Sequence, residues 1–388
     1  MEKLICRQCQ KVHEVEENAN SCPVCGNHRT YNFENSDTFL KKEVPRIRKE
    51  RTEAGLDRLS GRLRCAVINV EPYNLQSAVS ELLRRTGFHV SDAFEDQRFK
   101  TVVLSTENSA DLLVRCRLER INPFISVPGG PKSRKLPNTR LESFFFETPD
   151  IERYMEIQKE RGVVFLDCEQ VRDSDLSSAQ TIPSSYTGLS IGVIEGSPEN
   201  GYRTSGSRDL NLTLSKPPSK HLRNIGLLDH TATRVRAKDR DAAIIEFMEL
   251  TGYDFEFAIY VKTFNSITNV ARMKGKEFAM VFTSGIVPDD GADDAGPTEK
   301  FIRNYGTRVH HMALRTERIQ ETYKMLYEDG QEFMIELVGS PEEGLRQTFS
   351  EPSPYTMLVT ELIHRYGDFR GFFTRENVTE LTGATQEQ

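Results

Sequence analysis

Apolar and polar residues along most of the chain follow one of two periods. Runs such as CAVINV (65–70) and YTMLVTELIH (355–364) show the alternation typical of strands that are buried on one face. The runs AVSELLRRTGF (78–88) and AIIEFMELTGY (243–253) carry apolar residues at i, i+3, i+4 and i+7, which predicts amphipathic helices. Glycines that suit a helix stop follow the helical patterns at Gly87, Gly162, Gly252 and Gly330. These patterns together predict an α+β protein.

The predicted elements occur twice in the same order, over residues 63–195 and 225–382. Each copy contains a strand, a helix and several strands, and then the same series again. The corresponding segments are 65–70 and 230–235, 78–88 and 243–253, 140–165 and 308–333, and 186–195 and 355–364. We therefore predict two tandem domains of one design, the first over 63–195 and the second over 225–388.

The segments outside the two copies have a different composition. Residues 34–62 are dense in charge and poor in large apolar side chains, which predicts a linker with some helix and a solvated face. Residues 196–224 are rich in glycine, serine and proline and are interpreted as a connector between the domains. Residues 1–33 contain most of the cysteines of the chain.

Four of the seven cysteines form two Cys-x-x-Cys pairs, CRQC and CPVC. Two such pairs can place four thiolates tetrahedrally around Zn²⁺. Because a segment of this length has little core, bound zinc would supply most of its folding free energy. We predict a structural zinc ribbon over residues 1–33 with ligands Cys6, Cys9, Cys22 and Cys25. Few basic residues accompany them, which argues against a nucleic-acid-binding ribbon.

Composition narrows the class of protein. The 388 residues are 37% hydrophobic and 28% charged, which is the ordinary composition of a soluble globular protein. A net charge of -7 argues against general nucleic-acid binding. No apolar run approaches the length of a membrane span, and the start MEKLICRQCQ lacks the apolar core of a signal peptide. We expect a cytoplasmic protein with no membrane partner, and the sequence leaves homo-oligomerisation open.

The two copies differ where metal-binding side chains occur. Corresponding positions carry weak or no ligands in the first copy and good ligands in the second: Cys65 and His230, Ser143 and His311, Gly192 and Glu361. Two imidazoles and a carboxylate form a ligand set that suits Fe(II) and leaves positions open for substrate and O₂. Residues that served only as core filler would not collect in one copy. The second copy is therefore predicted to hold a metal ion.

Each ligand also has a structural alternative. A lone carboxylate on the buried face of TMLVTELI would cost several kcal/mol unless it bound a metal ion, but Glu361 could instead face solvent. Adjacent side chains of a strand point to opposite faces, so only one of His310 and His311 is expected to face the interior. Either imidazole could also be a hydrogen-bonded structural histidine.

The stretches LLDHTATRV, RVHHMALRTERI, RQTFSEPSPYTMLVTELIHRYG and RGFFTRENVTEL resemble the vicinal-oxygen-chelate superfamily, which is built from βαβββ modules. Within it, residues 225–382 resemble the 4-hydroxyphenylpyruvate dioxygenase family. The resemblance implies two tandem open barrels, with a mononuclear Fe(II) centre in the second. It implies His230, His311 and Glu361 as the iron ligands. It also implies a C-terminal helix that closes the pocket.

The resemblance further implies that Gln347 and Phe372 are pocket residues and that Asn269 lies on a strand that contributes a small polar pocket residue. Gln347 could equally be a strand residue whose amide bonds to the backbone. Arg272 and Arg346 could pair with a substrate carboxylate, although solvated positions are the simpler interpretation.

The chain departs from the family where substrate is contacted. FTSGI (282–286), GPTEKFIRN (296–304) and GFFTRENV (371–378) replace the characteristic segments of the family, and the ribbon is foreign to it. The leading hypothesis is an Fe(II)-dependent dioxygenase that uses O₂ to decarboxylate and oxidise a small organic acid, in particular a 2-oxo acid. One alternative is a metal-dependent isomerase, lyase or ring-cleaving dioxygenase, with His364 as the nearest spare histidine. A third is a non-enzymatic ligand-binding or scaffold protein.

Overall fold

The computed structural model describes most of the chain from residue 37 onward and parts of the N-terminal segment. The described residues are 2–6, 12–15, 21–26, 30–32, 37–119, 121–173, 175–275, 278–289, 291, 295–369 and 371–388. No helix among them is long and apolar enough to cross a membrane.

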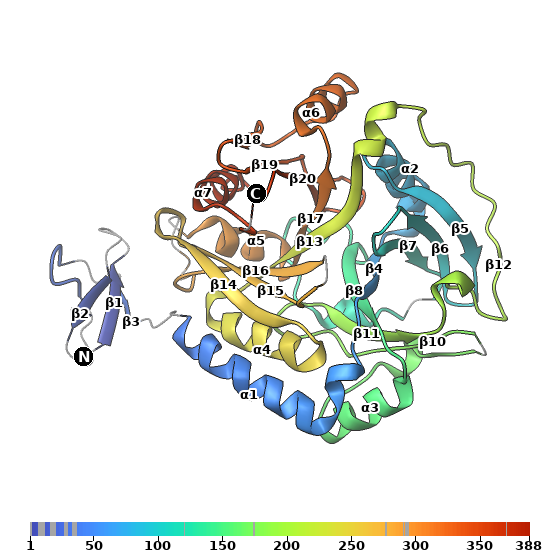
Figure 1. Cartoon of the computed structure of the whole chain (residues 1–388), viewed down its shortest axis with the longest axis horizontal. Coiled ribbons are helices and arrows are strands. Elements are labelled where there is room, and N and C mark those ends of the chain that lie inside the picture. The colour runs from blue at the N-terminus through green and yellow to red at the C-terminus, as the bar shows by residue number, and fades with distance from the viewer. Residues whose placement is uncertain are drawn as a thin grey trace.

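A small antiparallel sheet lies at the N-terminal end, apart from the main body of the molecule (Figure 1). Its strands are β1 (Glu2–Cys6), β2 (Val12–Val15) and β3 (Thr30–Asn32), in the order β2-β1-β3. Cys22 and Cys25 lie in a turn in which the Val24 amide is 3.4 Å from Cys22 Sγ. Cys9 and the side chain of Cys6 lie outside the described residues, so the zinc site stays a prediction.

The first copy of the repeat, together with one short strand of the connector, forms a nine-stranded mixed sheet. Its strands are β4 (Leu63–Asn69), β5 (His89–Glu95), β6 (Phe99–Ser105), β7 (Asp111–Arg117), β8 (Arg140–Glu147), β9 (Val171–Arg172), β10 (Ser177–Gln180), β11 (Ser190–Glu195) and β12 (Arg208–Asp209). They are ordered β12-β5-β6-β7-β4-β8-β11-β10-β9. Helices α2 (Leu75–Arg85) and α3 (Ile151–Glu160) follow β4 and β8. Without the edge strand β12, the sheet consists of two βαβββ modules side by side.

The second copy repeats this arrangement in an eight-stranded sheet. Its strands are β13 (Ile225–Val235), β14 (Asp254–Val261), β15 (Ser266–Arg272), β16 (Ala279–Gly285), β17 (Arg308–Thr316), β18 (Val338–Ser340), β19 (Leu345–Phe349) and β20 (Val359–Arg365). The order is β14-β15-β16-β13-β17-β20-β19-β18. Helices α4 (Arg240–Leu250) and α6 (Ile319–Glu328) follow the first strand of each module, α5 (Pro297–Tyr305) precedes β17, and α7 (Arg375–Ala384) ends the chain. The predicted α+β architecture of two tandem βαβββ pairs is confirmed.

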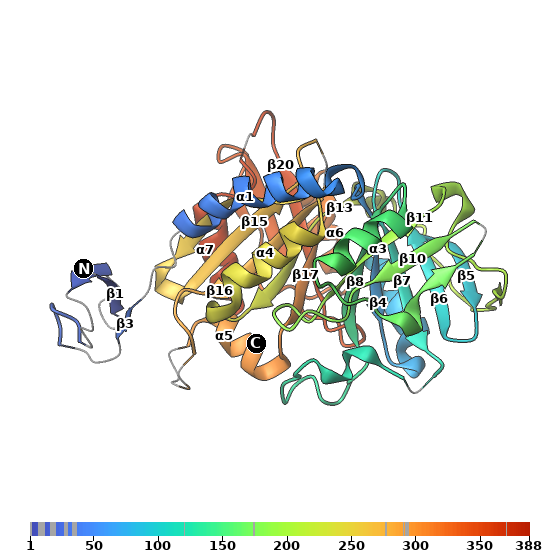
Figure 2. The same ribbon diagram turned by 90° about the horizontal axis from the view of Figure 1, so that it is seen from below.

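The segment before the first sheet contains the helix that the sequence predicted, but one side of this helix is packed against the body and is not solvated. Residues 38–54 form α1 (Thr38–Ala54), which lies along α4 and close to α3 (Figure 2). Leu40, Ile47 and Arg51 are buried in this contact. The Arg51 guanidinium donates to the carbonyl oxygens of Met248, Thr251 and Tyr253, at and just beyond the C-terminal end of α4. These hydrogen bonds cap the helix, which explains why a charged segment packs so closely.

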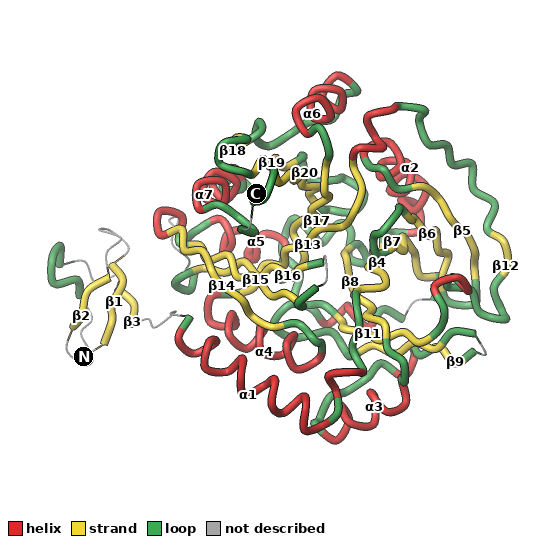
Figure 3. The backbone as a smooth tube through the Cα atoms, in the orientation of Figure 1, coloured by secondary structure: helices red, strands yellow, loops and turns green. Residues whose placement is uncertain are grey.

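The connector of residues 196–224 is also attached to the body (Figure 3). Its short strand β12 pairs with β5, and three leucines at alternate positions pack against the main core: Leu210, Leu212 and Leu214. Lys216 Nζ donates to the Thr86 carbonyl oxygen at 2.8 Å, and burial lowers the pKa of this amine to about 8. The glycine and serine content therefore predicted the irregular backbone but not its packing.

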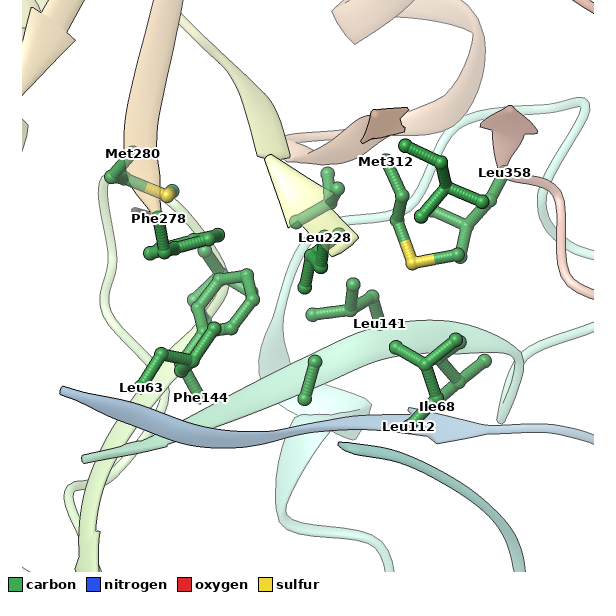
Figure 4. Close-up of a cluster of buried hydrophobic side chains, with 14 of the residues drawn as sticks. Leu63, Ile68, Leu112, Leu141, Phe144, Leu228, Phe278, Met280, Met312 and Leu358 are labelled. Carbon is green, nitrogen blue, oxygen red and sulfur yellow. The ribbon is translucent and has the colours of Figure 1, made fainter. Parts of the chain in front are cut away.

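One hydrophobic core joins the two sheets. Phenylalanine and leucine side chains from β4 and β8 meet apolar side chains from β13, β16 and β17 (Figure 4). Phe144 of the first half lies 5.8 Å from Phe278 of the second, measured between ring centroids. Burial of side chains of this size is the main favourable contribution to folding, about 1.5–3 kcal/mol for each.

Two of the four predicted helix-stop glycines have a different role. Gly162 and Gly330 have φ of +87° and +86°, the left-handed conformation expected of a helix stop. Gly87 is needed for space instead, because a Cβ there would lie 2.0 Å from the Ile225 carbonyl oxygen. Gly252, its counterpart in the repeat, would place a Cβ 2.3 Å from the Met273 methyl carbon.

Candidate metal centre and pocket

Three buried side chains converge on the inner face of the eight-stranded sheet. His230 comes from β13, His311 from β17 and Glu361 from β20, and one potential ligand atom of each lies within 4.8 Å of the others. Glu361 Oε2 is 3.1 Å from His230 Nε2 and 3.3 Å from His311 Nε2. Among the described residues, this is the one group of three or more His, Cys, Asp or Glu side chains with such a geometry.

Strand pairing explains why residues so distant in sequence meet. Ala313 on the central strand β17 pairs with His230 on one side and with Glu361 on the other. His311, two residues before Ala313, points to the same face. Because the side chain between His230 and Glu361 is a methyl group, the space between the imidazole and the carboxylate stays open.

A β-bulge orients the first histidine. The pairing of β13 with β17 skips Asp229, and Asp229 Oδ1 lies 2.9 Å from His230 Nδ1. Arg365 holds the same carboxylate with two hydrogen bonds of 2.6 and 3.0 Å. If His230 Nδ1 carries the proton and donates it to Asp229, the Nε2 lone pair faces Glu361. That buried Nε2 makes no hydrogen bond of good geometry, and its nearest acidic neighbour is Glu361 Oε2 at 3.1 Å, an arrangement that a metal ion between the two would satisfy.

A chain of two amides holds the carboxylate. Gln347 Nε2 donates to Glu361 Oε1 at 2.6 Å, and Asn377 Nδ2 of α7 donates to Gln347 Oε1 at 3.0 Å. Glu361 Oε2, the oxygen nearest the two imidazoles, is not involved in this chain. Gln347 therefore lies at the site, as the resemblance implied, and acts on the carboxylate as a positioning residue.

The neighbouring histidines both line the pocket, contrary to the expectation from simple alternation. A second β-bulge leaves His310 unpaired on β17, so the backbone turns both imidazoles inward. His310 Nδ1 lies 2.8 Å from His311 Nδ1. His310 thus contacts the candidate ligand His311. Of these two neighbouring histidines, only His311 directs its Nε2 to Glu361.

The electrostatics of the site fit a cation. Among the described residues no Lys or Arg pairs with Glu361, whose nearest basic partners are the two imidazoles. Burial lowers the pKa of His230, but Glu361 and Asp229 outweigh this effect and raise it to about 9. Burial and the nearby imidazoles hold the pKa of His311 well below its usual value. A divalent ion would supply the positive charge that the carboxylates favour, and it would bind both imidazoles in the neutral form.

The corresponding position in the nine-stranded sheet cannot hold the same ion. Phe145 takes the place of Ala313, and it pairs with Cys65 and Gly192 in the register in which Ala313 pairs with His230 and Glu361. The Phe145 ring fills the space, since a Cβ added at Gly192 would lie 2.5 Å from it. Burial raises the pKa of the Cys65 thiol to about 12, so it stays protonated at neutral pH.

The residues equivalent to the ligands have other partners in the first half. Ser143 donates to Gln180 Oε1 at 2.6 Å, and Gln180 donates to Glu169. Glu169 in turn pairs with Arg115 and Arg117. A buried ion-pair network therefore satisfies the polar groups of this half, which supports the interpretation that the first copy is structural.

The chain was compared with protein families, curated proteins and solved structures. No family model and no curated protein matches it. A triple mutant of 4-hydroxymandelate synthase from Streptomyces coelicolor superposes with a TM-score of 0.61 and 17% identity, over 85% of this chain and 99% of that one. A fusion of a xylose isomerase-like TIM barrel with 4-hydroxyphenylpyruvate dioxygenase gives a TM-score of 0.59 and 11% identity, over 90% of this chain and 57% of that one.

The chain has the vicinal-oxygen-chelate fold. The two superpositions cover both halves of the body, so the resemblance that the sequence gave best for residues 225–382 extends to the architecture of the whole body. Identities of 17% and 11% establish the fold and leave the chemistry to be argued from the side chains.

The pocket beside the ligands lies inside the second vicinal-oxygen-chelate barrel, and about 500 Å³ there is not filled by atoms, a volume that includes the open solvent at its mouth. Its walls come from β13, β15, β16, β17, β19 and β20, and α5 and α7 close it. The lining residues are Arg234, Ser266, Thr268, Val281, Thr283, Thr298, His310, His311, Gln347, Phe349, Glu361, Phe373, Val378, Leu381, Thr382 and Thr385. No tyrosine is among these described residues.

Two residues suggested by the resemblance are placed differently. Phe372 packs 5.5 Å from the His230 ring, centroid to centroid, but Phe373 rather than Phe372 lines the pocket. Asn269 points to the other face of β15, where it accepts from Arg240 Nε at 2.8 Å and donates to the Phe282 carbonyl oxygen. The suggestion for Asn269 is therefore corrected: alternation along β15 turns Thr268, not Asn269, toward the pocket.

The other candidates from the sequence also lie outside the pocket. Arg346 donates to the Gly339 carbonyl oxygen, and Arg272 faces Glu256. His364 Nδ1 lies 2.8 Å from the carbonyl oxygen of Thr316. The arginine that does line the pocket is Arg234, which sequence reasoning missed although it follows His230 at the strand spacing of four.

Replacing Asn377 with alanine is expected to weaken metal binding about 10- to 100-fold. Without its Nδ2 donor, Gln347 can rotate and release Glu361. Competition with a chromophoric chelator would measure the affinity for Fe(II) or Co(II). Thr379→Ala, on the same helix but outside the pocket, is the control and should bind metal normally. Equal affinities in the two variants would contradict the positioning role of Asn377.

Proposed function

We propose that the chain is a mononuclear non-haem Fe(II) dioxygenase whose substrate is a small organic acid of the 2-oxo acid class. The observation that supports this most is the convergence of three buried ligand atoms, from His230, His311 and Glu361, two of which belong to residues that line the pocket. Two imidazoles and one carboxylate on one face are typical of this class of iron site. The fold is shared with 4-hydroxymandelate synthase and with the dioxygenase part of the fusion protein.

Iron bound by His230, His311 and Glu361 would supply O₂ activation and a place for the two oxygens of a 2-oxo acid. In the overall reaction the acid loses CO₂. One atom of O₂ enters the new carboxyl group, and the other is added to the rest of the molecule. The protein shields the His230 ligand from water, since Phe372 and Phe373 pack edge-on against its imidazole at 5.5 and 5.1 Å between centroids. Asp229 and Gln347 keep the ligands in place.

The isomerase, lyase and ring-cleavage alternatives receive less support from the pocket. Acid–base chemistry on a ring requires a proton donor or acceptor beside the substrate. Among the described lining residues there is no tyrosine, and His364 lies outside the pocket with its Nδ1 directed to a backbone carbonyl. His310 is directed to His311 and to the Gln388 side chain.

The test is oxygen consumption by the full chain reconstituted with Fe(II) without air and then mixed with aerated solutions of 2-oxo acids. We expect at least one acid to give O₂ uptake and an equal amount of CO₂. Removing iron with a chelator should abolish the uptake, and Fe(II) but not Zn²⁺ should restore it. Product formation without O₂ uptake would instead support an isomerase or lyase, and would refute the proposal.

Ligand variants make the same test specific to the site. His311→Ala and Glu361→Gln are expected to lower O₂ uptake by more than about 100-fold, because each removes one of three ligands. His364→Ala is the matched control, since this histidine lies on the same strand as Glu361 but faces away from the pocket. Full activity in the two ligand variants would show that the centre lies elsewhere.

A further inference from the structure

Arg234 is a buried cation in the same pocket as the candidate metal ligands. It lies on β13 four residues after His230, on the order of 13 Å along an extended strand. Its side chain lines the pocket and is 5% exposed. The guanidinium carbon is 4.9 Å from the centre of the Phe301 ring. The pocket therefore has a metal-binding end and a cationic end.

No described carboxylate neutralises this cation. Nε and Nη1 of Arg234 are buried and have no hydrogen-bond partner. Burial alone lowers the pKa of the guanidinium to about 9, which leaves it charged at neutral pH. A buried charge without a counter-ion is costly, and proteins accept this cost mainly where a ligand supplies the opposite charge.

Proton positions along the histidine pair remove the remaining acceptor. A metal ion on His311 Nε2 requires the proton on Nδ1, which lies 2.8 Å from His310 Nδ1 and donates to it. His310 then carries its own proton on Nε2, which donates to Gln388 Oε1 at 2.7 Å. Arg234 Nη2 lies 3.3 Å from this same Nε2. Because that nitrogen carries a proton, it cannot accept a hydrogen bond from the guanidinium. With the metal bound, none of the contacts described for Arg234 supplies a hydrogen-bond acceptor.

The cationic end is also lined by hydroxyl groups. Four small hydroxyl side chains, from two strands and a helix, line the pocket with Arg234: Ser266, Thr268, Thr283 and Thr298. Hydroxyl groups can donate to carboxylate oxygens at the same time as a guanidinium does. The site offers a single fixed positive charge, which matches a carboxylate better than a doubly charged phosphate.

We propose that Arg234 binds a second carboxylate of the substrate, at the end opposite the metal, so that the substrate is a dicarboxylic 2-oxo acid. This inference rests on the proposed function, because the metal-binding end is assigned there to the 2-oxo acid group. It adds a substrate class: one acid group is held by the metal and the other by the guanidinium.

The test compares matched acids that differ only in the distal carboxylate. Probes are 2-oxoglutarate against 2-oxopentanoate and 2-oxoadipate against 2-oxohexanoate, titrated calorimetrically into Fe(II)-loaded full chain without O₂. Because a hydrogen bond to a charged group contributes more than a neutral one, we expect at least one diacid to bind on the order of 10-fold more tightly than its monoacid. In Arg234→Met this ratio should fall toward one. Arg346→Met, an arginine on β19 outside the pocket, should keep it.

The stability of the variant separates a binding residue from a structural one. An arginine that holds the fold together would lower the melting temperature when replaced. An arginine that lacks a counter-ion should leave the melting temperature of Arg234→Met unchanged or higher, and the diacid should stabilise only the wild-type protein. If Arg234→Met fails to fold, Arg234→Lys serves instead, and it should keep part of the diacid preference.

The outcomes separate this inference from the proposed function. Equal binding of monoacids and diacids, or a preference that persists in Arg234→Met, overturns the inference even if O₂ uptake is normal. Diacid binding that depends on Arg234 without O₂ uptake by any acid supports the cationic site and refutes the dioxygenase proposal.

Discussion

Replacing Ala313 with phenylalanine is expected to abolish metal binding without changing any ligand. Ala313 pairs with His230 on one side and Glu361 on the other, and its methyl group leaves the space in which the ligand atoms meet. The first half already shows the result, because Phe145 fills the equivalent space beside Gly192. Metal content after reconstitution should fall from one ion per site to a background level.

The fold should survive this change, since Phe145 at the equivalent position of the first half shows that such a sheet tolerates the ring. Overpacking of this kind costs about 1–3 kcal/mol of unfolding free energy. Circular dichroism and thermal unfolding would check that the variant is folded. Ala313→Ser is the control and should bind metal, because serine adds only one oxygen. Metal retention by the phenylalanine variant would mean that the ion does not bind beside Ala313.

Replacing Gly87 with alanine is expected to destabilise the protein far more than the same change at Gly252. The two glycines occupy equivalent positions, each two residues after the end of a helix, α2 and α4. A Cβ at Gly87 would lie 2.0 Å from the Ile225 carbonyl oxygen, and the Gly87 amide donates to that oxygen at 2.7 Å. A Cβ at Gly252 would lie 2.3 Å from the terminal methyl of Met273, which can rotate away. The Ile225 carbonyl oxygen is part of the backbone and cannot rotate away from a Cβ at Gly87.

Thermal or urea unfolding would measure the difference. We expect Gly87→Ala to lose about 3 kcal/mol or more, at the upper end of overpacking, and Gly252→Ala to lose less than about 1 kcal/mol. Gly226→Ala is a second control beside Ile225, since a Cβ there meets nothing within 4 Å. Similar losses at Gly87 and Gly252 would show that helix termination, which the two positions share, matters more than the contact.

The sequence allowed the fold and the ligand set to be predicted because the repeat constrains register. In the sequence repeat Cys65 corresponds to His230 and Gly192 to Glu361, and strand pairing repeats this correspondence residue by residue. A shift of one residue would have turned every candidate ligand to the other face. The period of the apolar residues indicates which face of each strand is buried, and the architecture could therefore be predicted from it.

The rest of the site depends on features that periodicity does not encode. Bulges at Asp229 and His310 break the alternation on which the expectation for His310 rested. The role of Asn377 requires α7 to fold back over β19, a long-range contact. Arg234 was missed because an arginine on a strand is ordinarily taken to face solvent, and only its burial without a carboxylate distinguishes it.

The aromatic contact between the two halves makes the folding of each half depend on the other. Phe144 and Phe278 belong to different halves but to one core, so neither half can bury its apolar face alone. A chain beginning at residue 225 would expose that face to water and would be expected to aggregate. The half without a ligand set therefore acts as an obligate folding partner. Substitutions in it would reduce the yield of folded protein while leaving the candidate metal centre of each surviving molecule unchanged.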